Sequence, residues 1–78
     1  MEVTAQDELK AHLMATDERF RQLANEHHEY DVKIHELEAK PALTAADEIE
    51  EHRLKKLKLH LKDQMTEIMN RYKAQHVA

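Results

Sequence analysis

The histidines and carboxylates in the middle of the chain are the residue types that could bind a metal ion. Seven of the 78 residues are histidines. His27, Asp31 and His35 are each four residues apart, and His28 precedes Asp31 by three, so neighbouring pairs could share one face of a helix. However, the sequence has no HExxH motif, and His27 and His35 would diverge by about 80° around a helix. We therefore expect hydrogen-bonded or solvated histidines, no metal site and no cofactor, with a zinc site as the alternative.

A basic segment at residues 53–62 is the second candidate site. It contains no acidic residue and five cations, Arg53, Lys55, Lys56, Lys58 and Lys62. Such a segment can bind an acidic partner, an anionic membrane surface or a nucleic acid. The net charge of −4 and the lack of aromatic residues between the cations speak against nucleic acid. The alternative is charge pairing within the protein, with Glu26, Glu29 and Asp31 of the acidic first half of the chain.

The residue types that support catalysis are mostly missing. The chain has no cysteine, serine or glycine, which excludes disulfides, thiol and serine nucleophiles, and glycine-rich phosphate loops. Bare paired helices also offer no concavity in which a general acid and base could be kept from water. The sequence therefore predicts a protein that is not an enzyme.

A capping pattern and a proline mark the two ends of a first helix. Thr4 can accept a hydrogen bond from the backbone three residues on, and Asp7 stands where the reciprocal acidic partner belongs. Pro41 lacks a backbone donor and restricts the residue before it. We expect this helix to span about residues 5–39.

A second helix is expected over about residues 45–75, after a linker at 40–44. Thr44 and Asp47 repeat the capping pattern at its start. So short a linker between two long helices favours antiparallel neighbours, although a bent rod or a domain-swapped rod is possible. The sequence thus predicts a single helical domain over residues 1–78.

Apolar residues recur along both expected helices with the alternating spacing of a heptad repeat. The first seam is Leu9, Leu13, Thr16, Phe20, Leu23, His27, Tyr30, Ile34 and Leu37. The second seam is Leu54, Leu57, Leu61, Met65, Ile68 and Tyr72. Paired in antiparallel order, from Ile34 with Leu54 to Thr16 with Tyr72, the residue numbers sum to 87 or 88. The predicted fold class is all-α, with two long helices forming an antiparallel coiled-coil hairpin.

His27 is a polar residue on the otherwise apolar first seam. A histidine at such a position can fix the register of the helices and make stability depend on pH. Protonation of His27 in a dry seam would loosen the structure. The alternative is that the imidazole reaches water at the edge of the seam.

Several apolar residues fall outside both seams. They are Met14, Val32, Leu43, Leu59 and Met69. A single pair of helices cannot cover its own edges, and a chain of this length rarely has a large stability margin. We therefore expect a homodimer that forms a four-helix bundle, with a marginally stable monomer as the alternative.

Four short motifs follow one another in the middle of the chain. They are HHEYD at 27–31, IHELE at 34–38, LKK at 54–56 and LKD at 61–63. Their order resembles the YdcH-like family of small bacterial helical-hairpin proteins of unknown function, over about half of the chain. The resemblance implies a helical hairpin from the bacterial cytoplasm and no particular activity. Tyr30 and Leu57 depart from the family pattern, which makes Leu59 the alternative to Leu57 on the second seam.

The chain has no apolar run close to the roughly 18 to 20 residues that span a bilayer, and its start does not have the pattern of a signal peptide. We expect a cytoplasmic protein. The predicted function is a structural or adaptor protein that self-associates and binds an unknown protein partner through charged helix faces. A weak nucleic-acid-associated protein that uses the basic segment is the alternative.

Overall fold

The computed structural model describes residues 5–75, which form three α-helices and no strand. The helices are α1 (Ala5–Thr16), α2 (Glu18–Glu38) and α3 (Ala45–Gln75). The predicted all-helical class is therefore confirmed. The single helix expected over about 5–39 is corrected, because the chain leaves the helical conformation between α1 and α2.

The break falls at Asp17, where the local sequence both ends one helix and starts the next. Asp17 has an extended backbone with φ −115° and ψ 108°, and its side chain accepts a hydrogen bond from the Phe20 backbone N–H at 2.9 Å. Thr16 donates its hydroxyl to the His12 carbonyl at 2.8 Å. An aspartate at the N-cap satisfies a free N–H at the start of a helix, and back-bonding by threonine bends one. The other predicted cap, Thr4, lies outside the described residues.

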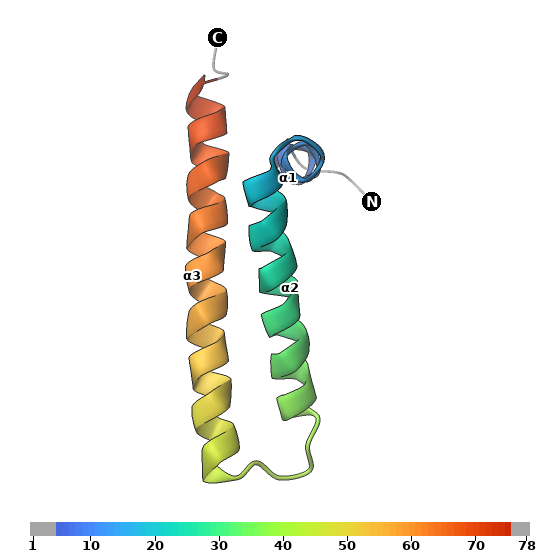
Figure 1. Ribbon diagram of the computed structural model, residues 1–78, viewed down its shortest axis with the longest axis vertical. Helices are drawn as coiled ribbons and strands as arrows, with labels where there is room; N and C mark the ends of the chain where they lie inside the picture. Colours follow the sequence, from blue (N-terminus) through green and yellow to red (C-terminus); the bar gives the residue numbers. More distant parts are fainter. Residues whose placement is uncertain (1–4, 76–78) are drawn as a thin grey trace.

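The arrangement of the helices is elongated (Figure 1). α2 and α3 lie side by side and run in opposite directions, while α1 lies across the far end of α2 rather than continuing it. The 31 residues of α3 give it a length of about 46 Å at ~1.5 Å per residue. The radius of gyration is 15.6 Å, against about 12 Å for a compact domain of this length. For most of their length, α2 and α3 therefore form a layer one helix thick.

The connection between α2 and α3 has the capping box that the sequence predicts. The Asp47 backbone N–H donates to the Thr44 hydroxyl, and the Thr44 backbone N–H donates to the Asp47 carboxylate, both at 3.1 Å. Lys40 donates to the other Asp47 oxygen at 3.0 Å. The backbone donor of Thr44, followed by Lys40, lowers the pKa of Asp47. These bonds fix the start of α3 directly after the turn.

Seven side chains of the described residues are buried. They are Leu13, Phe20, Leu23, Ile34, Leu54, Leu61 and Met69. The first six belong to the predicted seams. Met69 was placed outside them, and this was wrong, because only 3% of it is exposed. The crossing of α1 over the end of the α2 and α3 layer explains the difference, since Met69 packs in one cluster with Leu13 and Phe20.

This cluster takes the place of the last predicted pair between the two seams, Thr16 with Tyr72. Leu9, Met65, Ile68 and Tyr72 pack around it. Thr16 is exposed, while the ring of Tyr72 lies 5.3 Å from the ring of His12. The pairing expected between Thr16 and Tyr72 assumed one straight helix and does not describe α1.

The second seam runs through Leu57 rather than through Leu59, the alternative at this position. Leu57 is half-buried, whereas 59% of Leu59 is exposed. Leu59 therefore lies on the side of α3 that faces away from α2.

Candidate functional site

The five cations of the basic segment are distributed around α3 and do not share one face. Arg53 pairs with Glu50 of the same helix, with Nη2 at 2.5 Å and Nε at 3.1 Å from the two carboxylate oxygens. This pair lowers the pKa of Glu50 and raises the pKa of Arg53. Arg53 is therefore already bound to a carboxylate.

Two lysines of the segment contact α2. Lys58 Nζ lies 2.6 Å from Asp31 Oδ1, and this hydrogen bond lowers the pKa of Asp31. Lys55 Nζ lies 3.7 Å from Glu38 and 3.3 Å from Glu51. Charge pairing between helices, the alternative for this segment, is thus present at Lys58 with the expected Asp31. Lys55 pairs instead with Glu38, and Glu26 and Glu29 form no ion pair with the segment within residues 5–75.

The remaining two lysines of the segment, Lys56 and Lys62, form no ion pair within residues 5–75. Lys56 lies beside Leu59 and Asp63 in a shallow groove on α3. Lys62 lines a different cavity, at the junction of the three helices. Of the predicted partner-facing set, only these two remain unpaired in the described part of the chain, and they belong to different surfaces.

The junction of the three helices forms a cavity of about 380 Å³ that is partly open to solvent. Its lining residues are Gln6, Lys10, His27, Lys58, Lys62, Met65, Thr66 and Met69. None of them is acidic, although the protein has a net charge of −4. Sequence reasoning identified His27, Lys58 and Lys62 separately and missed Lys10, Gln6 and Thr66. The capping signal at Asp17 could have indicated that α1 turns toward them.

His27, the predicted pH-sensitive residue, is half-buried in this cavity. Burial lowers the pKa of His27 below 6.5, and the charge of Lys58 lowers it further. Lys62 and Lys10 act in the same direction, while Asp31 opposes them. The surroundings therefore favour the neutral imidazole.

We expect the protein to lose stability as the pH falls below 6.5. Above this value His27 is neutral in both the folded and the unfolded chain. Below it, the unfolded chain binds a proton that folded His27 resists, and the loss is complete once the pH is below the folded pKa. The melting temperature, measured by circular dichroism, should be lower at pH 5.5 than at pH 7.5.

The matched variants for this measurement are His27→Gln and His28→Gln. We expect His27→Gln to reduce the difference between the two pH values, while exposed His28 can be replaced with no such change. An equal pH dependence in wild type and His27→Gln would contradict the assignment to His27.

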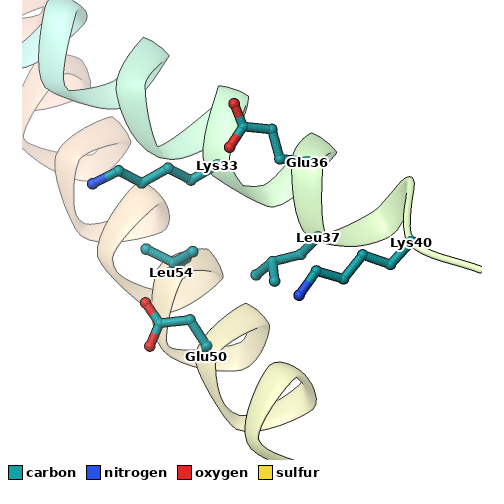
Figure 2. Close-up of a pocket in the computed structure, with 6 residues that line it drawn as sticks. All are labelled: Lys33, Glu36, Leu37, Lys40, Glu50 and Leu54. Atoms are coloured by element: carbon teal, nitrogen blue, oxygen red, sulfur yellow. The ribbon is translucent and has the colours of Figure 1, made fainter. Parts of the chain in front are cut away.

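A second cavity, of about 300 Å³, lies between α2 and α3 near their connection. Figure 2 shows Leu37 and Leu54 between the two helices, with Glu36 pointing away from them. The lining also includes Lys33, Lys40 and Glu50, so its two cations are balanced by two carboxylates. This balance gives the cavity no preference for the sign of a charged ligand.

The histidines and carboxylates of the predicted alternative metal site do not converge. His35 donates from Nδ1 to the backbone carbonyl of Asp31 at 2.8 Å, and the same nitrogen is 3.8 Å from the Asp31 carboxylate. Within residues 5–75, no group of three or more histidine, cysteine, aspartate or glutamate side chains is arranged to hold a metal ion. None of the described helices is both long enough and apolar enough to cross a membrane.

The three helices and their charged surfaces define a small all-helical protein. The chain belongs to the family described as "Protein of unknown function (DUF465)", whose family model matches residues 20–69. The resemblance to the YdcH-like family is consistent with this match. The matched range contains all of α2 except its first two residues and most of α3, but excludes α1, and with it Lys10 and Gln6. No curated protein and no solved structure matches the chain.

Proposed function

We propose that this protein is a non-enzymatic structural or adaptor protein of the cytoplasm. In this proposal, α2 and α3 act as an antiparallel hairpin that self-associates into a four-helix bundle. The charged outer faces of the homodimer then bind another protein. The observation that carries the proposal is the apolar surface left exposed on a layer one helix thick.

This exposed surface lies away from the contact between α2 and α3. Ile49 is 71% exposed and Leu59 is 59% exposed. Each is five residues from buried Leu54, which corresponds to about 140° around the helix. Both therefore lie on the back of α3. On α2, Val32 is 42% exposed. Exposure of large apolar side chains to water is unfavourable in free energy, and burial between two copies would remove this unfavourable contribution.

The charges on the back of α3 suit contact with a second copy. Lys56 and Asp63 lie in the same groove as Leu59, with opposite charges on either side of it along the helix. A two-fold symmetric dimer places the same patch of each copy face to face. In an antiparallel contact centred near Leu59, each Lys56 would lie opposite an Asp63 of the other copy.

Sedimentation equilibrium at pH 7.5, from low to high micromolar concentration, tests the proposal. We expect a dimer, and we expect Leu59→Glu to weaken it by at least about tenfold, because the change places a charge in an apolar contact. Val32→Glu makes the same change on α2 and tests whether the contact is on the back of α3. A monomer at every concentration would overturn self-association.

A weak nucleic-acid-associated protein remains the second candidate, because Lys56 and Lys62 are available for phosphate contacts. Their location on different surfaces, and the pairing of Arg53, Lys55 and Lys58, make this function less well supported. Electrophoretic mobility of DNA and RNA with increasing protein at about 50 mM salt tests it, since binding through phosphates is strongest at low salt. An unchanged mobility would rule this candidate out.

A further inference from the structure

We propose that the cavity at the junction of the three helices binds a small anion that carries a phosphate group. The proposal goes beyond the adaptor function and does not depend on it. It rests on the charge, size and lining chemistry of the cavity.

Positive charge converges on the cavity from different helices. Lys10 comes from α1 and Lys62 from α3, and both line the same cavity. Neither forms an ion pair within the part of the chain that the structure describes. Like charges brought to one site repel each other, and a bound anion would remove this repulsion.

Cations outnumber anions in the lining of the cavity. Lys58 also lines the cavity, and its charge is shared with Asp31 at 2.6 Å. Asp31 itself is not a lining residue. The lining therefore offers three lysines and one histidine with no carboxylate. An anion with two negative charges would be matched by Lys10 and Lys62 without breaking the contact between Lys58 and Asp31.

The size of the cavity and its neutral lining residues also suit a small organic phosphate. A volume of about 380 Å³ lies at the lower end of the ~300–1,000 Å³ typical of small-molecule sites. Gln6 and Thr66 can donate hydrogen bonds to anionic oxygens, and Met65 and Met69 form an apolar wall. Lysine is a common phosphate ligand. These features fit a phosphate group attached to a small organic part.

His27 links this binding to protonation. Protonated His27 would add a cation beside Lys10, Lys58 and Lys62, with Asp31 as the acidic group that acts on it. An anion in the cavity would compensate for that charge. By linkage, binding and protonation strengthen each other to the same extent.

The test follows the methionine methyl groups by nuclear magnetic resonance during titration with sodium pyrophosphate at constant ionic strength. We expect saturable shifts of Met65 and Met69, and no shift of Met14, which is exposed on α1. Lys62→Gln and Lys10→Gln should each weaken the fitted affinity by at least about fivefold, and the double variant by more. Lys56→Gln removes an equal charge from the back of α3 and should leave the affinity unchanged.

Two results would overturn the proposal. One is the absence of a saturable shift. The other is an equal loss of affinity in Lys56→Gln and Lys62→Gln, which would indicate diffuse attraction to the basic segment. Both lysines are exposed, and circular dichroism of each variant checks that the helices are retained.

The same titration with glycerol phosphate and with phosphatidic acid vesicles distinguishes the two sources of such a phosphate. Binding of the free phosphomonoester supports a soluble ligand, and binding only to vesicles supports a lipid headgroup. Sulfate tests the role of His27, because the charge of sulfate is constant between pH 7.5 and 5.5. We expect tighter sulfate binding at pH 5.5 in wild type and no difference between the two pH values in His27→Gln. Equal pH dependence in both would exclude His27 from the site.

Discussion

Replacement of Phe20 with alanine is expected to leave a large fraction of the protein unfolded at 25 °C. Phe20 is 1% exposed and lies in the cluster with Leu13 and Met69, where side chains of all three helices meet. Loss of a buried phenylalanine costs about 3–5 kcal/mol, because apolar contacts are lost and a cavity remains. The core of a chain this short rarely provides more than about 3–5 kcal/mol. The expected loss is therefore comparable to the whole free energy of unfolding.

Urea denaturation followed by circular dichroism measures this effect. Arg21→Ala is the matched control, because Arg21 is the next residue on α2 and its side chain is exposed. We expect the control to change the free energy of unfolding by less than about 0.5 kcal/mol. A Phe20→Ala protein with the stability of the control would show that α2 does not depend on this cluster.

The second large effect is expected for Leu13→Ala. Leu13 is the buried residue of α1, with 3% exposure, and it holds α1 against Phe20 and Met69. Removal of a buried leucine side chain beyond Cβ costs about 2–5 kcal/mol. We expect this loss in the free energy of unfolding, and we expect the contact between His12 and Tyr72 to disappear, because α1 separates from α3.

Met14→Ala is the control, since Met14 is the neighbour of Leu13 and is 36% exposed. Its effect on the free energy of unfolding should be below about 0.5 kcal/mol. Proton nuclear Overhauser effects between the rings of His12 and Tyr72 report the position of α1. Retention of these contacts in Leu13→Ala would contradict the role given to Leu13.

The match between sequence and structure is closest where local chemistry decides the conformation. Pro41 ends α2 within a few residues, and Thr44 with Asp47 starts α3, because both signals act on the backbone nearby. The apolar repeat also identified six of the seven buried side chains. Their periodicity depends only on which residues share a helix face.

The candidate site was less accessible to sequence reasoning. The basic segment is continuous in sequence, but each residue of a helix is rotated by about 100° from the one before it. Lys55 and Lys58 therefore reach carboxylates of α2, Lys56 lies on the back of α3, and Lys62 reaches the cavity. The cavity has two basic residues outside this segment, His27 and Lys10. Lys10 lies 52 residues before Lys62 in sequence. No local pattern connects them.

The sequence by itself determined that this protein is helical, where α3 begins and which residues form most of its core, and it contains no cysteine or serine. Only the tertiary structure decided that Asp17 separates two helices, that Met69 is buried, and that lysines from α1 and α3 line one cavity. The physical reason is that Thr16 and Asp17 can interrupt a helix or be tolerated within one. Whether the helix is interrupted or continues through these residues depends on the apolar surface that Leu9 and Leu13 bury. The interruption is favoured if they bury more across the end of α3 than along a straight helix.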